Sequence, residues 1–165
     1  AKKHNKKVFS VVANMSIALE RRDFLKSIDC FVCNIQEAGM LFSDDYTDKS
    51  TEEMIEILSQ KVIAAQIPSM IITMGGKGAV YADKYGQKGY CPARRVEVKD
   101  TTGAGDGFIG SFLYQCAFKD IHDFSALSSN ELEIMLRKSS IFAGESVTKH
   151  GAISSYPTSL SEDNE

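Results

Sequence analysis

Short, continuous apolar runs that alternate with helical patterns are the feature that most constrains the fold of this chain. The runs occupy residues 8–13, 28–33 and 70–74, and each is about as long as one strand. A strand that is apolar along its whole length is typical of a parallel sheet covered on both faces. Together with the helical segments between them, the runs predict an α/β fold with a mainly parallel sheet.

Helical segments are predicted between these runs. One covers residues 17–27, and another begins at Asn34, directly behind the second run. Ser50 and Glu53 match a capping box, in which the two side chains bind backbone N–H groups at the start of a helix. The helix behind this box has one apolar face, formed by Ile55, Leu58, Val62 and Ala65.

The second half of the chain is predicted to add a hairpin, an alternating strand and two helices. Residues 80–82 and 89–91 flank a polar turn, as in a hairpin. Residues 95–99 alternate strictly between polar and apolar side chains, so we expect a strand with one solvated face. Ser128 and Glu131 match a second capping box, which precedes a long amphipathic helix.

The composition fits one globular domain and disfavours several classes of partner. The 165 residues are 43% hydrophobic and carry a net charge of -3, so we expect a single α/β domain over residues 1–158 and a polar tail over residues 159–165. The basic cluster at residues 2–7 is typical of a solvated lead-in, which leaves no nucleic-acid surface. The sequence contains no run as long as a membrane span and no secretory signal, which predicts no membrane partner and a cytoplasmic location.

The four cysteines do not match a zinc or redox site. Cys30 and Cys33 form one Cys-x-x-Cys pair, but Cys91 and Cys116 stand alone. Because the pair flanks two apolar residues, we predict buried thiols.

Residues 100–107 form the motif with the most chemical content. They read Asp-Thr-Thr-Gly-Ala-Gly-Asp-Gly, and the apolar residues that follow have helical spacing. Backbone amides at the start of such a helix can hold a phosphate. Asp106 would repel that phosphate, so it must be stabilised by the helix dipole, take part in proton chemistry, or both. The structural alternative is an Asp that only caps the helix. The residues by themselves leave both interpretations open.

Two common nucleotide motifs fit this region poorly. Gly105, Gly107 and Gly110 match the dinucleotide-binding spacing, but the preceding strand alternates and no buried strand follows that could carry a ribose-binding acid. No Gly-Lys pair is followed by Ser or Thr at the spacing of a P-loop.

Three polar segments each follow a predicted strand. They are residues 34–37, 73–78 and 100–106, and ligands of α/β sheets bind beyond the carboxyl ends of the strands. Glycine amides, an acid and a helix start suit phosphoryl transfer to an alcohol, which needs donors around the phosphoryl group, a metal on its oxygens and a base for the hydroxyl. Asp106 is the candidate base.

Residues 100–106 also resemble, without a mismatch, the C-terminal signature of the ribokinase family of sugar and nucleoside kinases, also called the phosphofructokinase B family. The resemblance extends over nearly the whole chain. Residues 34–38 resemble the family's Asn-x-x-Glu segment, residues 72–78 its strand and glycine turn at the nucleotide site, and residues 147–152 the end of the helix beside the adenine pocket.

The resemblance implies a ribokinase-like three-layer α/β/α sandwich that binds ATP and Mg²⁺ and phosphorylates a hydroxymethyl group of a sugar or nucleoside. It implies that Asp106 is the base and that the amides of Gly103, Ala104 and Gly105 form an anion hole for the γ-phosphate. Glu37 would act at the metal through bound water. The nucleotide-binding residues that the resemblance implies are Asn34, Thr73, Gly75, Gly76, Gly78, Thr102, Gly103 and Gly105.

The chain departs from the family in length. Members have an N-terminal part with a Gly-Gly signature, a lid and most sugar-binding residues, and nothing here corresponds to them. We therefore expect a fragment of a longer kinase, with an exposed sheet edge that favours a homodimer. The alternatives are a half-kinase with a separate role, a non-catalytic nucleotide-binding or interaction module, and a relative of the hydroxymethylpyrimidine and pyridoxal kinases, against which the Gly-Ala-Gly-Asp motif argues.

Overall fold

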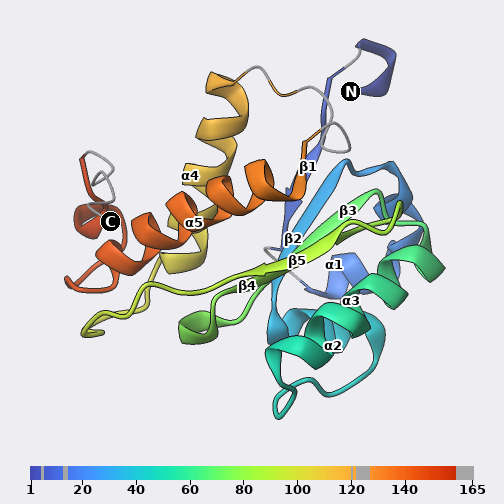
Figure 1. Ribbon diagram of the computed structural model, residues 1–165. Coiled ribbons are helices and arrows are strands. Elements are labelled where there is room, and N and C mark those ends of the chain that lie inside the picture. The colour runs from blue at the N-terminus through green and yellow to red at the C-terminus, as the bar shows by residue number, and fades with distance from the viewer. Residues whose placement is uncertain (5, 13–14, 120, 122–126, 159–165) are drawn as a thin grey trace.

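The computed structural model describes residues 1–4, 6–12, 15–119, 121 and 127–158, and it contains a five-stranded mixed sheet with helices on both faces (Figure 1). The strands lie in the order of the chain: β1 (Phe9–Val11), β2 (Cys30–Asn34), β3 (Ser69–Thr73), β4 (Ala79–Asp83) and β5 (Lys88–Cys91). The first three are parallel, and β4 is antiparallel to both β3 and β5. Four of the five strands therefore point the same way, which confirms the mainly parallel sheet.

Helices follow the strands and cover the sheet. The α-helices are α1 (Met15–Glu20), α2 (Ile35–Phe42), α3 (Thr51–Ala65), α4 (Ala104–Phe118) and α5 (Ser129–Ser146). Short 3₁₀ turns are η1 (Lys2–His4), η2 (Arg22–Ser27), η3 (Gly75–Lys77) and η5 (Ile153–Ser155). Both capping boxes expected from the sequence are present, at the starts of α3 and α5.

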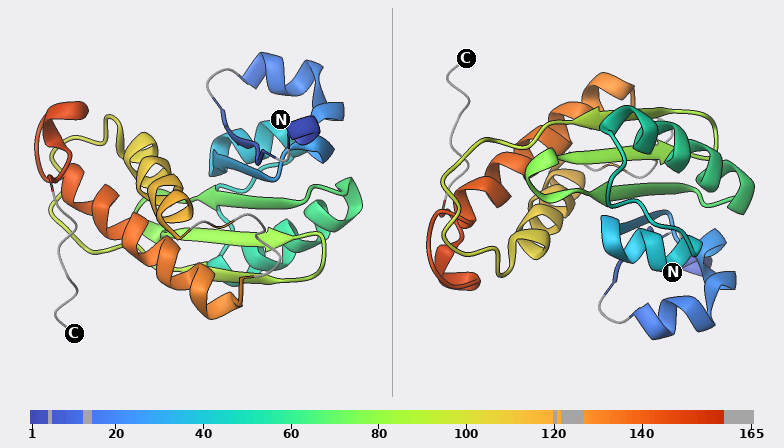
Figure 2. Two further views of the ribbon diagram at one scale, coloured as in Figure 1. Left: turned by 90° about the horizontal axis from the view of Figure 1, so that it is seen from above. Right: turned by 90° about the horizontal axis from the view of Figure 1, so that it is seen from below.

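The sheet separates two hydrophobic cores because successive side chains of a strand point to opposite faces. On β3, Met70 and Ile72 pack with α2 and α3, whereas Ile71 packs with α4 and α5. Figure 2 shows these helix pairs on opposite sides of the sheet. The three-layer α/β/α sandwich is thereby confirmed.

Two secondary-structure predictions need correction. The helix predicted over residues 17–27 is divided into α1 and the 3₁₀ turn η2. The strand predicted over residues 95–99 is wrong, because this segment is irregular and pairs with no strand among the described residues. Pro92, directly after β5, has no N–H to donate to a ladder, and Lys99 N–H instead donates to the carbonyl of Val147 at the end of α5 (2.8 Å).

Three further features of the sequence concern the C-terminal tail, possible membrane spans and the cysteines. The predicted polar tail, residues 159–165, lies outside the described residues. Within the described part of the chain, no helix combines the length and apolar character needed to cross a bilayer. Cys30 and Cys33 are buried and unpaired, as predicted, and Cys91 and Cys116 are buried and unpaired as well.

Candidate functional site

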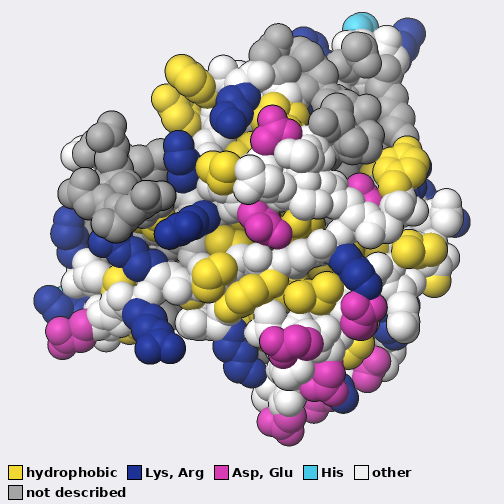
Figure 3. Space-filling model, viewed as in Figure 1, with side chains coloured by type: hydrophobic (Ala, Val, Ile, Leu, Met, Phe, Trp, Pro, Cys, Tyr) yellow, Lys and Arg dark blue, Asp and Glu magenta, His cyan; other side chains and the backbone are white. Residues whose placement is uncertain are grey.

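A cleft of about 530 Å³ opens between the loop after β3, the irregular segment that follows β5, and α5. In Figure 3, Lys and Arg side chains gather over this segment and the end of α5, on the left of the view. The cleft is lined by Thr73, Gly75, Gly76, Gly78, Ala93, Arg94, Arg95, Val96, Val98, Thr101, Ala104, Gly105, Phe108, Ser140, Ala143, Gly144 and Val147. Most of the lining surface is apolar.

Gly103 shapes the loop at the start of α4. It is the N-cap of this helix with φ of 78°, a left-handed conformation that favours glycine. A Cβ atom here would lie 2.9 Å from the Cβ of Ala152 and 2.9 Å from the hydroxyl of Tyr156. Its carbonyl accepts hydrogen bonds from Gly107 N–H (2.8 Å) and from the Tyr156 hydroxyl (2.9 Å). Only glycine fits this position without rearrangement.

The first-turn amides of α4 differ in availability. Ala104 N–H donates to the carbonyl of Thr101 (3.2 Å), so it already has a partner. The N–H groups of Gly105 and Asp106 have no acceptor among the described residues, as is usual in the first turn of a helix. A Cβ atom on Gly105 would meet nothing within 4 Å. Space for an anion therefore lies beside Gly105, at the edge of the cleft.

Asp106 has an exposed carboxylate in this same first turn. It does not line the cleft itself but directly follows Ala104 and Gly105, which do. Its side chain accepts no hydrogen bond from a described residue, so it does not cap the helix through its own carboxylate. The negative charge of Asp106, after burial as the main cause, raises the pKa of the neighbouring Tyr156.

Asp100 ties the loop to the end of α5. Its carboxylate accepts hydrogen bonds from Thr102 N–H (2.9 Å) and Gly151 N–H (2.9 Å). These bonds, with that from Gly151 the larger cause, lower the pKa of Asp100 to about 2. Sequence reasoning gave Asp100 no separate role, although an acid two residues before Thr102 is a known signal for this kind of turn.

Asn34 and Glu37 lie at the same edge of the sheet but do not line the cleft. They form a third capping box, at the start of α2: Glu37 N–H donates to Asn34 Oδ1 (2.9 Å) and Asn34 N–H donates to Glu37 Oε2 (2.7 Å). Asn34 is beside Thr73 in the register of β2 and β3. The other carboxylate oxygen of Glu37 has no hydrogen-bond partner among the described residues.

The structure brings together one group of the predicted site residues. Thr73, Gly75, Gly76, Gly78, Ala104 and Gly105 all line the cleft, whereas Asn34, Glu37, Thr102, Gly103 and Asp106 lie outside its lining. The sequence did not indicate the wall formed by residues 93–98, because the alternation of residues 95–99 predicts a strand. Gly144 on α5 was missed as well, and the close approach of Arg94 to this glycine could be found only in three dimensions.

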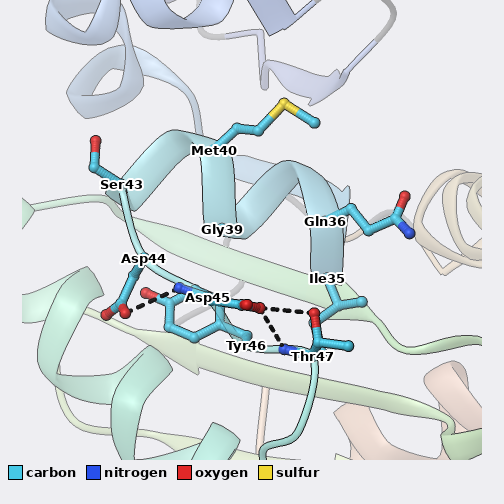
Figure 4. Close-up of a pocket in the computed structure, with 9 residues that line it drawn as sticks. All are labelled: Ile35, Gln36, Gly39, Met40, Ser43, Asp44, Asp45, Tyr46 and Thr47. Atoms are coloured by element: carbon cyan, nitrogen blue, oxygen red, sulfur yellow. Dashed lines mark hydrogen bonds between the residues drawn. The ribbon is translucent and has the colours of Figure 1, made fainter.

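The described residues contain no group of three or more His, Cys, Asp or Glu side chains placed to hold a metal ion. In proteins, Mg²⁺ commonly keeps several water ligands and binds phosphate oxygens together with one or two carboxylates. A second hollow of about 410 Å³ lies between α2 and residues 43–47 (Figure 4). Its Asp45 carboxylate is already bound by the Thr47 N–H (2.9 Å) and hydroxyl (2.7 Å).

Comparison with known proteins gives a consistent result. The model of the family described as "pfkB family carbohydrate kinase" matches residues 1–159. Deoxyribokinase from Salmonella typhi is 32% identical over 159 residues, which are 95% of this chain and 46% of that protein. Ribokinase from Mus musculus is 32% identical over 134 residues, which are 81% of this chain and 38% of that protein.

Solved structures show the same fold. The structure of Arabidopsis thaliana ribokinase complexed with ribose and ATP superposes on this chain with a TM-score of 0.75 at 24% sequence identity. The superposed region covers 94% of this chain and 46% of the Arabidopsis chain. The chain thus spans about half the length of the relatives that it matches. Because the family match extends over residues 1–159, the chain belongs to the pfkB family of carbohydrate kinases.

Proposed function

We propose that this chain is the nucleotide-binding and catalytic part of a kinase that transfers the γ-phosphoryl group of ATP to a hydroxymethyl group of a sugar or nucleoside. One observation carries the proposal. Asp106, an exposed carboxylate without a hydrogen-bond partner among the described residues, lies in the first turn of α4, next to free amides at the edge of the cleft. A base and anion-binding donors at one helix start are what this transfer needs.

In the proposed reaction, Asp106 accepts the proton of the acceptor hydroxyl as its oxygen attacks the γ-phosphorus. The new O–P bond forms as the bond between the γ-phosphorus and the bridging oxygen of ADP breaks. The N–H groups of Gly105 and Asp106 stabilise the charge on the phosphoryl oxygens. We infer these donors, in place of the amide of Ala104, because Ala104 N–H is bound to Thr101.

The cleft suits a nucleotide by its chemistry. Val96, Val98 and Ala143 provide apolar walls for the flat faces of a base. Gly75 and Gly76, beside which a Cβ atom would meet nothing within 4 Å, leave room for the phosphates. The free oxygen of Glu37 fits a water molecule bound to Mg²⁺, which would neutralise charge on the phosphates.

The relatives support the proposed acceptor class. Proteins similar to this chain are named deoxyribokinase, ribokinase and guanosine-inosine kinase, which suggests a sugar or nucleoside as acceptor.

We place the protein in the cytoplasm, because four unpaired cysteines suit a reducing compartment.

Calorimetric titration of the chain with ATP and ADP tests the nucleotide site. Gly144→Val should weaken binding about tenfold or more, because overpacking costs roughly 1–3 kcal/mol and 1.4 kcal/mol is tenfold. A Cβ atom at Gly144 would already lie 3.3 Å from the Cβ of Arg94 on the opposite wall. Gly110→Val is the matched control, since a Cβ atom at Gly110 would meet nothing within 4 Å. Equal affinity of both variants would place the nucleotide elsewhere.

A non-catalytic nucleotide-binding module is the second candidate, because a cleft lined by two glycine loops would serve binding without transfer equally well. This candidate requires tight ATP or ADP binding by the 165 residues themselves, with no phosphoryl transfer after an acceptor-binding part is supplied. Transfer under that condition would exclude it.

A further inference from the structure

Tyr156 connects the C-terminal end of the described chain to the loop that begins α4. It follows the 3₁₀ turn η5 and is partly buried. Its hydroxyl donates to the carbonyl of Gly103 (2.9 Å), the same carbonyl that accepts the first hydrogen bond of α4, from Gly107 N–H (2.8 Å). The Tyr156 hydroxyl therefore binds the peptide group at the N-cap of α4, and the orientation of this peptide group affects the geometry of the first turn.

The ring of Tyr156 contacts two helices. It packs against Phe142 of α5, with ring centroids 5.6 Å apart and an interplanar angle of 49°. It also approaches Gly107 of α4 so closely that a Cβ atom there would lie 3.1 Å from its Cε1. Because both α4 and α5 contact the ring, the direction of the hydroxyl is set by packing.

The charge of Asp106 acts on this phenol. Burial and the nearby carboxylate both disfavour the phenolate and raise the pKa of Tyr156, so the hydroxyl keeps its proton at neutral pH. That proton is donated to Gly103, and Asp106 receives no hydrogen bond from Tyr156. The carboxylate of Asp106 is thereby left available.

We propose that Tyr156 is a positioning residue for the site: its hydroxyl fixes the carbonyl of Gly103, and with it the orientation of the Gly105 and Asp106 amides toward the γ-phosphate. The part of this inference that concerns the γ-phosphate rests on the proposed function. A residue that served only to pack the two helices would act through its ring, which Phe retains.

Amide hydrogen exchange in the 165-residue chain tests the mechanical part. Tyr156→Phe should speed exchange at Gly107 about five- to tenfold, the effect of losing one typical hydrogen bond. The Met54 amide, which bonds Ser50 at the start of α3 (3.0 Å), should be unchanged. Tyr85→Phe removes the same atom from an exposed ring and should change neither amide. Unchanged exchange at Gly107 in Tyr156→Phe would overturn the proposal.

The affinities for ADP and for the β,γ-imido analogue of ATP test the chemical part. Tyr156→Phe should lower the affinity for the analogue several-fold and leave that for ADP within twofold, because only the analogue has a γ-phosphate. A parallel loss for both ligands would indicate packing only and contradict the proposal. If the wild-type chain bound neither ligand, the proposed function would fail, and the exchange experiment would decide the role of Tyr156 by itself.

Discussion

Gly103 and Gly105 belong to the same short motif but have different tasks. Gly103 has a left-handed backbone and close neighbours on the side where a Cβ would stand, so its requirement is conformational. Gly105 has a helical backbone and open space beside it, so its requirement is access to a ligand. Asp100 and Asp106 differ in a similar way: the first is bound by two backbone amides, and the second has no such partner among the described residues.

Asp100 provides a prediction on pH dependence. Its pKa is about 2 in the folded chain, below the ordinary value of 3.8, so the carboxylate stabilises the fold fully above pH 4 and loses this effect as pH falls through 2. Asp100→Asn should lower the free energy of unfolding at pH 7, and its deficit relative to wild type should shrink between pH 4 and pH 2. Urea unfolding at a series of pH values measures this, with the exposed Asp48→Asn as control. A deficit that stays constant down to pH 2 would show that the charge has no part in it.

At the scale of elements, local signals predicted more than tertiary ones. The buried strands and the capping boxes of α3 and α5 were visible because each depends on a few neighbouring residues. Residues 95–99 alternate like a strand, yet they bind the end of α5 instead of a sheet edge. Which residues line the cleft depends on this packing, so Gly144 and Val96 had no local signal. Asn34 and Glu37 were noticed, but their mutual capping was not.

Glu37 has a structural role in the capping box of α2 and a proposed role at the metal, and a substitution that keeps the box can distinguish the two roles. Gln also completes a capping box, so Glu37→Gln should leave the free energy of unfolding nearly unchanged and remove the charge. We expect Mg²⁺ to strengthen ATP binding less in this variant than in wild type. Calorimetry with and without Mg²⁺ measures the difference. Glu37→Ala, which removes the hydrogen bond from Asn34 N–H and should cost about 1 kcal/mol of stability, provides the comparison.

If Glu37→Gln keeps the full Mg²⁺ dependence, Glu37 serves only the helix. A large loss of stability in the same variant would instead show that Gln does not replace the cap.

At the scale of the whole molecule, β1 is an edge strand of the sheet that the described residues form, with β2 beside it. Val11 on this edge strand is 43% exposed, and the chain covers 46% of Salmonella typhi deoxyribokinase. The cleft and the start of α4 lie within the described residues, whereas no acceptor-binding surface is assigned to them. The account therefore predicts a nucleotide site here and phosphoryl transfer only when an acceptor-binding part is joined to it.

The most direct test of the central claim is the rate of phosphoryl transfer by an enzyme in which residues 1–165 are joined to the part that binds the acceptor. Asp106→Asn should lower kcat at least ~100-fold, since general base catalysis contributes about 10²–10⁴, and should leave the Kd for ATP within about twofold. Asp48→Asn, the same chemical change at an exposed position, should leave both unchanged. An Asp106→Asn enzyme with the kcat of wild type would contradict the account.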